Sequence, residues 1–240
     1  MRDTNGQSAG KDIILSFLVG VYLGDGCVYH QEGTNNYIFR LSSIDEDFVK
    51  TVQKCFFYLI GKSGNIQQAT IKTTFSNPNK KRTIYTYTVY SKRIFSVFTR
   101  LTKGKTKIPR MIKRTPAITR AFIAGLMDSE GYIAHYKNKW AFESGFCGSN
   151  EWVKEIKEIL LSIGCFSGII TTTLPGGKKN LKKNHYSFHI NVKSFIDSGC
   201  FFTIRRKWLR IIDASLFYNT TPPVNLVYEI LRDFTPCSHK

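Results

Sequence analysis

The most informative absence in this sequence is that of acidic residues from one long segment. Between Phe48 and Met127 the chain has no Asp or Glu, while 17 Lys and Arg fall in those 80 residues. The whole chain of 240 residues has a formal net charge of +18, and its 42% of hydrophobic residues argue against disorder. A segregated field of one sign is typical of proteins that bind a long polyanion. The composition therefore predicts a nucleic acid as the partner.

Three further absences concern location. The six cysteines lack the CxxC spacing and the His partners of a zinc site. Residues 1–10 lack the apolar core of a secretory signal. The apolar run from Ile13 to Gly24 is 12 residues long, which is too short to span a bilayer. We therefore expect reduced thiols in an intracellular protein with no membrane partner, located in the cytoplasm or in an organelle.

Two stretches share one pattern, and they run from Leu18 to Gly26 and from Ile123 to Gly131. Each is an apolar run with small residues four apart, closed by an acid and a glycine. Residues four apart are neighbours on a helix, so the small residues of each stretch form one face that lets another backbone approach closely. The candidate residues of this helix interface are Gly20, Gly24, Gly125 and Ser129.

The order of features recurs after about 100 residues. Gly20 and Gly125 are 125 − 20 = 105 residues apart, and Gly61 and Gly164 are 164 − 61 = 103 apart. Each copy is predicted to be an αββαββα unit. We expect an α+β fold of two pseudo-symmetric halves, with antiparallel sheets and the two motif helices packed at the centre. The predicted parts are a flexible tail (1–11), an N-terminal half (12–102), a basic linker (103–115), a C-terminal half (116–213) and a C-terminal extension (214–240) with a helix around 226–232.

Each motif ends in an acid, Asp25 or Glu130, and the glycine after it lies where a helix would end. The negative end of a helix dipole disfavours an anion, and two adjacent carboxylates do not both ionise cheaply without a cation. Mg²⁺ prefers a few carboxylate oxygens and completes its shell with water and phosphate. The pair predicts metal-assisted phosphodiester hydrolysis. Gly24 and Ser129, which precede the two acids, are further candidates for the metal site.

Basic residues and polar strand faces complete the predicted site. Lys105 and Lys207 lie near the end of each copy and are candidate catalytic cations, with phosphate contact elsewhere as the alternative. A β-ribbon fits the major groove, where its side chains reach base edges. A one-residue slip would expose the other face of a strand. The candidate DNA-binding residues are Arg40, Gln68, Lys72, Arg82, Thr86, Lys107, Lys137, Lys139, His185, Ser187, His189 and Arg206.

Both motifs resemble the LAGLIDADG signature of homing endonucleases and related maturases. Asp25 and Glu130 match its final acid, Asp128 matches its middle Asp, and Leu23 departs from that Asp. The spacing resembles that of the single-chain, two-motif members, whose halves form a saddle over DNA. The resemblance implies a monomer that makes a staggered break in double-stranded DNA. It also implies that both acids bind Mg²⁺, for which Mn²⁺ could substitute, while Ca²⁺ would support binding without cleavage.

Two alternatives stay open at this stage. One is an intron-splicing maturase that binds its own intron RNA, with or without DNA cleavage, and the other is a DNA-binding regulator. An acid in both motifs favours the nuclease, because neither alternative needs two. The halves differ at most sheet positions, so we expect a long and asymmetric target of the kind used in intron homing.

Overall fold

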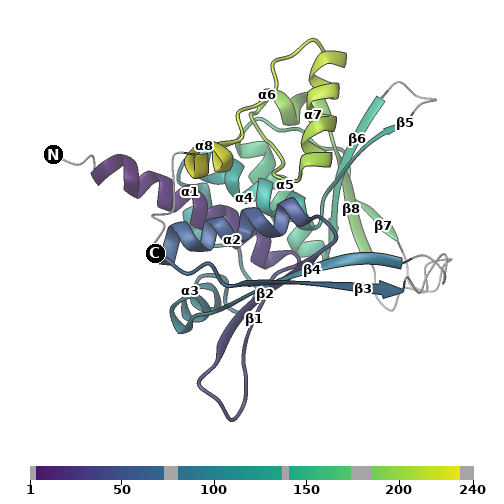
Figure 1. Ribbon diagram of the computed structural model, residues 1–240. Helices are drawn as coiled ribbons and strands as arrows, with labels where there is room; N and C mark the ends of the chain where they lie inside the picture. Colours follow the sequence, from purple (N-terminus) through teal and green to yellow (C-terminus); the bar gives the residue numbers. More distant parts are fainter. Residues whose placement is uncertain (1–3, 73–80, 137–140, 174–184, 233–240) are drawn as a thin grey trace.

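A computed structural model describes residues 4–72, 81–136, 141–173 and 185–232 (Figure 1). The N-terminal half contains α1 (Thr4–Leu23), β1 (Cys27–His30), β2 (Tyr37–Ser43), α2 (Glu46–Ile60), β3 (Asn65–Lys72), β4 (Lys81–Tyr90) and α3 (Lys92–Thr102). The 3-10 helix η1 (Arg110–Lys113) lies in the connector. The C-terminal half contains α4 (Pro116–Ser129), β5 (Tyr132–Tyr136), β6 (Ala141–Gly148), α5 (Asn150–Ser162), β7 (Thr171–Thr173), β8 (His185–Ile190) and α6 (Val192–Asp197). Helices α7 (Arg205–Phe217) and α8 (Leu226–Arg232) follow. The predicted repeat of two αββαββα units is confirmed.

The strands form two antiparallel sheets, with the orders β1-β2-β4-β3 and β5-β6-β8-β7. Helices cover one face of each sheet (Figure 1). In β2, Phe39 and Leu41 are buried against the helices while Arg40 and Ser42 are exposed. We call the side that carries Arg40 and Ser42 the open face of the first sheet. Strands β1 to β4, over the range that the structure describes, contain no Asp or Glu.

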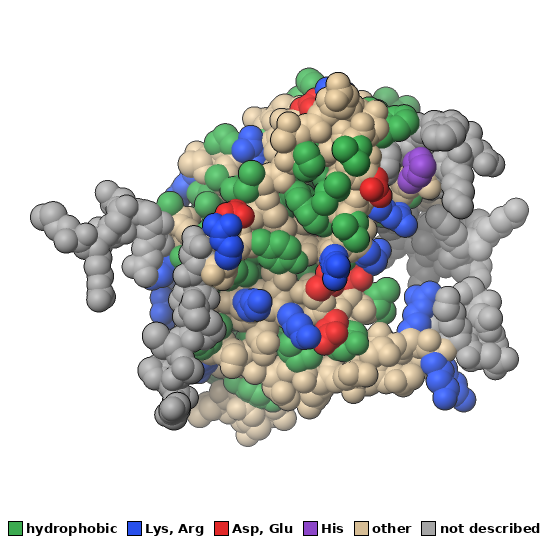
Figure 2. Space-filling model, turned by 45° about the horizontal axis from the view of Figure 1, so that its top comes forward, with side chains coloured by type: hydrophobic (Ala, Val, Ile, Leu, Met, Phe, Trp, Pro, Cys, Tyr) green, Lys and Arg blue, Asp and Glu red, His purple; other side chains and the backbone are tan. Residues whose placement is uncertain are grey.

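The helical side of the molecule has a different character. Figure 2 looks toward it from the top of Figure 1, and acidic side chains there lie among basic and hydrophobic ones. The helical surface in this view is therefore not uniformly basic, although the chain as a whole carries an excess of basic residues. The acid-free strands of the first sheet are the better complement to a polyanion.

Helices α1 and α4 form the predicted central interface. A Cβ atom added to Gly20 would lie 2.2 Å from the carbonyl oxygen of Phe122, and one added to Gly125 would lie 2.1 Å from that of Phe17. The hydroxyl of Ser16 also donates a hydrogen bond of 2.8 Å to the carbonyl of Ile118. Only glycine permits these backbones to come so close, so the small-residue face predicted from sequence is confirmed.

The chain ends differ from the sequence prediction. Helix α1 begins at Thr4, so the prediction of a flexible tail over 1–11 is wrong for residues 4–11. Gly10 is buried there, and an added Cβ would meet the hydroxyl of Tyr58 at 2.8 Å and a methyl of Ile230 at 3.8 Å. The polar composition of residues 1–11 favoured a tail over a helix, so the sequence did not indicate this packing against α2 and α8. The helix predicted near the C-terminus is confirmed as α8, while α7 runs past residue 213 to Phe217.

Candidate active site

The two motif acids lie at the ends of the two packed helices. Asp25 follows α1, where the amide of Gly26 donates to the carbonyl of Val21, and Glu130 caps α4 through its own amide. A Cβ atom added to Gly24 would lie 2.4 Å from the Cβ of Ser129 and 3.3 Å from the Cγ of Glu130. The glycine seam therefore brings both acids to one edge of the α1–α4 interface, and both side chains are exposed.

Lys105 lies against the end of α1. Its ammonium donates a hydrogen bond of 2.8 Å to the carbonyl of Gly24 and stands 5.1 Å from the ring centroid of Tyr22. Burial lowers the pKa of Lys105, while the charges of Glu130 and Asp25 act to raise that pKa. The structure thus places a half-buried cation beside both acids, as the sequence predicted.

Asp25 interacts electrostatically with Lys105, which follows the N-terminal half, and with Lys207 of the C-terminal half. Partial removal of water raises the pKa of the Asp25 carboxyl, and the charges of Lys207 and Lys105 lower it in part. The pKa of Asp25 is thus shifted by burial and by two nearby cations, and shifted pKa values of this kind are common at functional sites. A hard cation bound there would favour the ionised carboxylate further.

Lys207 has a role that the sequence did not predict. Its side chain is buried, with 5% exposed, and its ammonium donates hydrogen bonds of 2.8 Å to the carbonyls of Met127, Asp128 and Gly131. An ammonium has three donors, so none is left for a phosphate in this arrangement. The prediction of Lys207 as a catalytic cation is therefore corrected: it holds the C-terminal end of α4.

We expect the substitution Lys207→Met to destabilise the fold. Methionine keeps the apolar stem but removes the three hydrogen bonds to the carbonyls of Met127, Asp128 and Gly131, and each such bond typically contributes about 1 kcal/mol. Urea denaturation should show a loss of about 3 kcal/mol in the free energy of unfolding. Lys105→Met is the matched control, because Lys105 is half-buried and makes one such bond. Equal stability of the two variants would contradict this role for Lys207.

Asp128 is a structural residue of α4. It is buried, and its carboxylate accepts hydrogen bonds from the amide and hydroxyl of Thr203 (2.8 and 2.6 Å) and from the amide of Ile204 (3.3 Å). Burial raises the pKa of Asp128 to about 6, against the lowering effect of Lys207. Asp128 thereby fixes the start of α7. Tyr228 of α8 braces the same loop by donating to the carbonyl of Thr203 at 2.5 Å.

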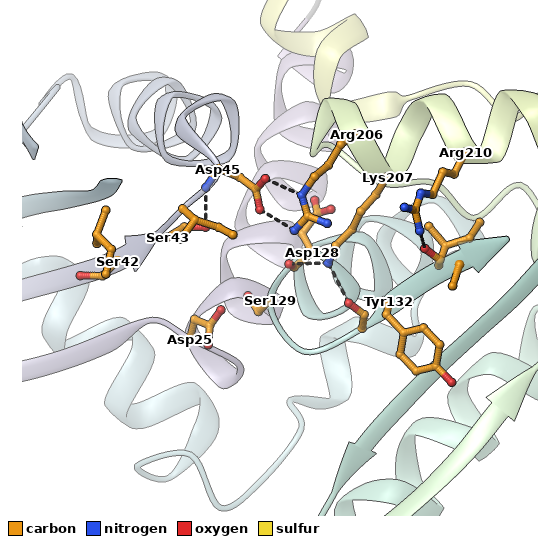
Figure 3. Close-up of a pocket in the computed structure, with 15 residues that line it drawn as sticks. Asp25, Ser42, Ser43, Asp45, Asp128, Ser129, Tyr132, Arg206, Lys207 and Arg210 are labelled. Carbon is orange, nitrogen blue, oxygen red and sulfur yellow. Dashed lines mark hydrogen bonds and ion pairs between the residues drawn. The ribbon is translucent and has the colours of Figure 1, made fainter. Parts of the chain in front are cut away.

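A cavity of about 500 Å³ opens beside Asp25. Figure 3 shows Asp25 and Ser129 on one side of it and Lys207 and Arg210 on another. Its wall also includes Ser42 and Ile84 from the first sheet. The open face of that sheet is therefore continuous with the space in front of the acid.

Arg206, predicted to bind DNA, is engaged within the protein. Its guanidinium makes a bidentate ion pair with Asp45, with distances of 2.6 and 2.8 Å (Figure 3). Beside it, the amide of Arg205 donates to Asp47 at 2.5 Å. The start of α2 in one half is thus tied to the start of α7 in the other. Arg206 therefore joins the halves, and its contact with DNA stays a prediction.

Two residues of the cavity wall, Arg210 and Tyr132, are not among the site residues predicted from sequence. Arg210 donates to the carbonyl of Ile133, and the hydroxyl of Tyr132 lies 3.1 Å from Nδ1 of His189. Arg210 belongs to the basic cluster around Lys207, so its charge was the available signal. Tyr132 stands directly after the motif glycine, a position that the signature itself does not mark.

The donors near the acids suit a hard cation in kind. Two carboxylates and nearby carbonyl oxygens are the ligands that Mg²⁺ prefers. Within the described part of the chain no group of three or more His, Cys, Asp or Glu side chains could hold a metal, so water and phosphate would complete the shell. Of the two further candidates, the Gly24 carbonyl already accepts the Lys105 ammonium, and the Ser129 hydroxyl donates to the Gly125 carbonyl at 3.1 Å.

The strand register sorts the candidate DNA-binding residues. Cross-strand partners share a face. Arg40, Arg82 and Thr86 lie on the open face, where Thr86 faces Ser42 and Gln67. Gln68 pairs with Tyr85, whose ring packs against the core, so the prediction of Gln68 is corrected to Gln67.

The remaining candidates divide as follows. Lys72 has the same parity along β3 as Gln68, so it does not lie on the open face. Lys107 is exposed in the connector. Ser187 and His189 alternate with buried Phe188 and lie on the open side of the second sheet. Lys137 and Lys139 and the side chain of His185 lie outside the described part of the structure.

Comparison with known proteins adds a sequence relative and two folds. A protein of Methanocaldococcus jannaschii, described as uncharacterized, is 28% identical over 174 residues, or 72% of this chain. The chain spans just over half of that relative, 57% of its length. The homing endonuclease I-WcaI, solved bound to its DNA recognition sequence, matches 88% of this chain and 94% of its own, with a TM-score of 0.55 and 12% identity. Full-length WhiA from Thermatoga maritima matches 92% of this chain and 66% of its own, with a TM-score of 0.51 and 13% identity.

Two further findings bear on the class of protein. Among the described residues, no helix has both the length and the apolar character needed to cross a membrane. The profile of a LAGLIDADG-like domain matches residues 12–102, the segment that holds α1 with Asp25. The second half repeats this unit, and the two solved structures share the fold. Residues 12–102 therefore resemble a LAGLIDADG-like domain, and the chain shares the fold of these two solved structures.

Proposed function

We propose that this protein is a site-specific DNA endonuclease that makes a staggered double-strand break by metal-dependent phosphodiester hydrolysis. The observation that carries the proposal is the meeting of Asp25 and Glu130 across a glycine seam, with Lys105 beside both. One chain supplies both acids, so the enzyme acts as a monomer. Its two sheets differ in sequence, so the target is long and asymmetric.

Each group in the site has a defined part in this proposal. Asp25 and Glu130 would hold Mg²⁺, and the bound ion would supply an activated water and stabilise charge on the phosphate. Lys105 keeps two N–H donors beyond its bond to Gly24, and these neutralise charge that develops on a nonbridging oxygen. The sheets bind the duplex so that its backbone crosses the acid edge.

A second candidate function is nucleic-acid binding without cleavage, on DNA or on an intron RNA. The observation that favours it is the balance of charge within the protein, because Lys105 and Lys207 both act on Asp25. Such a site would be stable with no metal at all. The likeness to WhiA is a likeness of fold and is compatible with either function.

Selection from a random duplex library distinguishes these functions. In Ca²⁺ we expect the protein to retain a defined family of duplexes, and in Mg²⁺ we expect it to cut the same duplexes on both strands. Retention without cutting in Mg²⁺ or Mn²⁺ would support the second function. Binding should weaken steeply with salt, since phosphate contacts release counterions.

The variant Lys105→Met tests the catalytic cation. We expect the cleavage rate at saturating protein to fall by about 10²-fold, since a positioned charge donor contributes on that scale. Affinity for the uncut duplex in Ca²⁺ should change little. Losses of equal size in binding and cleavage would instead make Lys105 a phosphate contact.

A further inference from the structure

The open face of the first sheet contains an apolar row among polar residues. Ala69 pairs with Ile84 across β3 and β4, and Ile71 pairs with Arg82 at the next position on the same face. Ala69, Ile71 and Ile84 therefore form one patch, which we call the apolar row. Ile71 is 44% exposed, and Ile84 is half-buried at the cavity beside Asp25.

Core packing does not account for the apolar row. The core residues of these strands, such as Tyr87 and Val89, point to the helical side, and the apolar row has the opposite parity. A single exposed isoleucine is common, but Ala69, Ile71 and Ile84 are contiguous on one face, and contiguous apolar patches are typical of interaction sites.

The second sheet has polar residues at the positions of Ala69 and Ile84. With the repeat offset of 185 − 84 = 101, His185 takes the place of Ile84, and Thr173, which pairs with His185, takes that of Ala69. The counterpart of Ile71 lies outside the described residues. Thr171 and Ser187 join their hydroxyls at 3.0 Å across β7 and β8, whereas Ser42 and Thr86 do so at 2.9 Å across β2 and β4. At the positions of Ala69 and Ile84 the first sheet is therefore apolar and the second is polar.

The charge around the apolar row favours DNA over a protein surface as its occupant. Arg82 lies within the same face, and the strands β1 to β4 described in the structure have no acid. A two-stranded ribbon fits the major groove, and the apolar group displayed there is the 5-methyl of thymine. Hydroxyl and amide neighbours such as Thr86 and Gln67 suit the polar base edges on either side.

We propose that the apolar row reads thymine methyl groups in the half of the target bound by the first sheet. This inference rests on the proposed binding of DNA. The row begins at the cavity beside Asp25, so the thymines lie close to the scissile phosphates and continue outward from them. The polar second sheet would impose no such methyl dependence on its own half-site.

The test uses duplexes selected from a thymine-containing random library in Ca²⁺, which are then rebuilt with uracil in place of thymine in one half at a time. Uracil lacks only the 5-methyl group. We expect uracil in the first-sheet half to weaken binding about fourfold for each methyl contacted, the scale of one buried methyl group. Uracil in the other half should have little effect.

Variants assign the effect to the row. Ile71→Thr and Ile84→Thr keep β-branched side chains. In each variant the ratio of the affinity for the thymine duplex to that for the uracil duplex should fall toward one. Val224→Thr, at a 60% exposed position outside both sheets, is the control and should keep the wild-type ratio.

Three results would overturn the inference. A wild-type ratio near one in both halves would do so while leaving the endonuclease proposal intact. An unchanged ratio in both isoleucine variants would also do so. Self-association that is lost in Ile71→Thr would assign the row to a protein interface instead. Failure of the wild-type protein to select any duplex would overturn the proposed function itself.

Discussion

Asp25→Asn and Glu130→Gln are each expected to abolish double-strand cleavage. Both substitutions keep the side-chain size but remove a negative charge from the site proposed for the metal. Metal-ion catalysis contributes several kcal/mol, and each 1.36 kcal/mol corresponds to tenfold in rate. We therefore expect the cleavage rate to fall by at least about 10³-fold for either variant. The measurement is single-turnover cleavage of a selected duplex in Mg²⁺.

Binding and stability separate this effect from a loss of structure. Both side chains are exposed, so the free energy of unfolding should change little. Affinity in the absence of divalent cations should stay the same or rise, since a negative charge near the phosphates has been removed. Asp213→Asn, at an exposed position on α7, is the matched control. Cleavage at the wild-type rate by either active-site variant would exclude the two-acid mechanism.

The sequence predicted most of the elements because the periodic signals were strong where the core is. In β2, buried Phe39 and Leu41 flank exposed Arg40, and the alternation fixed the open face correctly. In β3 nearly every residue is exposed, from Asn65 to Lys72. Each face of that strand mixes polar and apolar residues, so no hydrophobic pattern specifies the register, and the sequence predicts Gln68 where the structure places Gln67 on the open face.

The candidate site was predicted in part for a related reason. Asp25 and Glu130 meet because the two motifs place them at helix ends, and the repeat marks those ends. Lys105 lies in the connector after α3, and its charge in that basic segment was the signal. The pair of Asp45 and Arg206 joins residues 161 apart in sequence, and opposite charge alone gives no pairing. Lys207 resembles any basic surface residue in sequence, since only the tertiary fold reveals the three carbonyls around its ammonium.

Gly20→Ala and Gly125→Ala are expected to be the most destabilising single-methyl changes at the central interface. The added Cβ would meet a carbonyl oxygen of the facing helix at 2.2 or 2.1 Å, and backbone cannot move aside as a side chain can. Overpacking commonly costs 1–3 kcal/mol, and a clash with backbone lies at the upper end, about 3 kcal/mol. For a chain of this size we expect the melting temperature to fall by roughly 6–12 °C.

The control and the consequence for activity follow from the same geometry. Gly168→Ala is the control, because its added Cβ would lie 3.7 Å from the carbonyl of His189, in ordinary contact. If the Gly20 variant still folds, α1 and α4 must separate, and Asp25 and Glu130 move apart with them. Catalysis depends on positions within about 1 Å, so cleavage should fall by more than the loss of folded protein explains. A Gly20→Ala variant with wild-type stability and cleavage would show that the close approach of α1 and α4 is not needed to place the two acids.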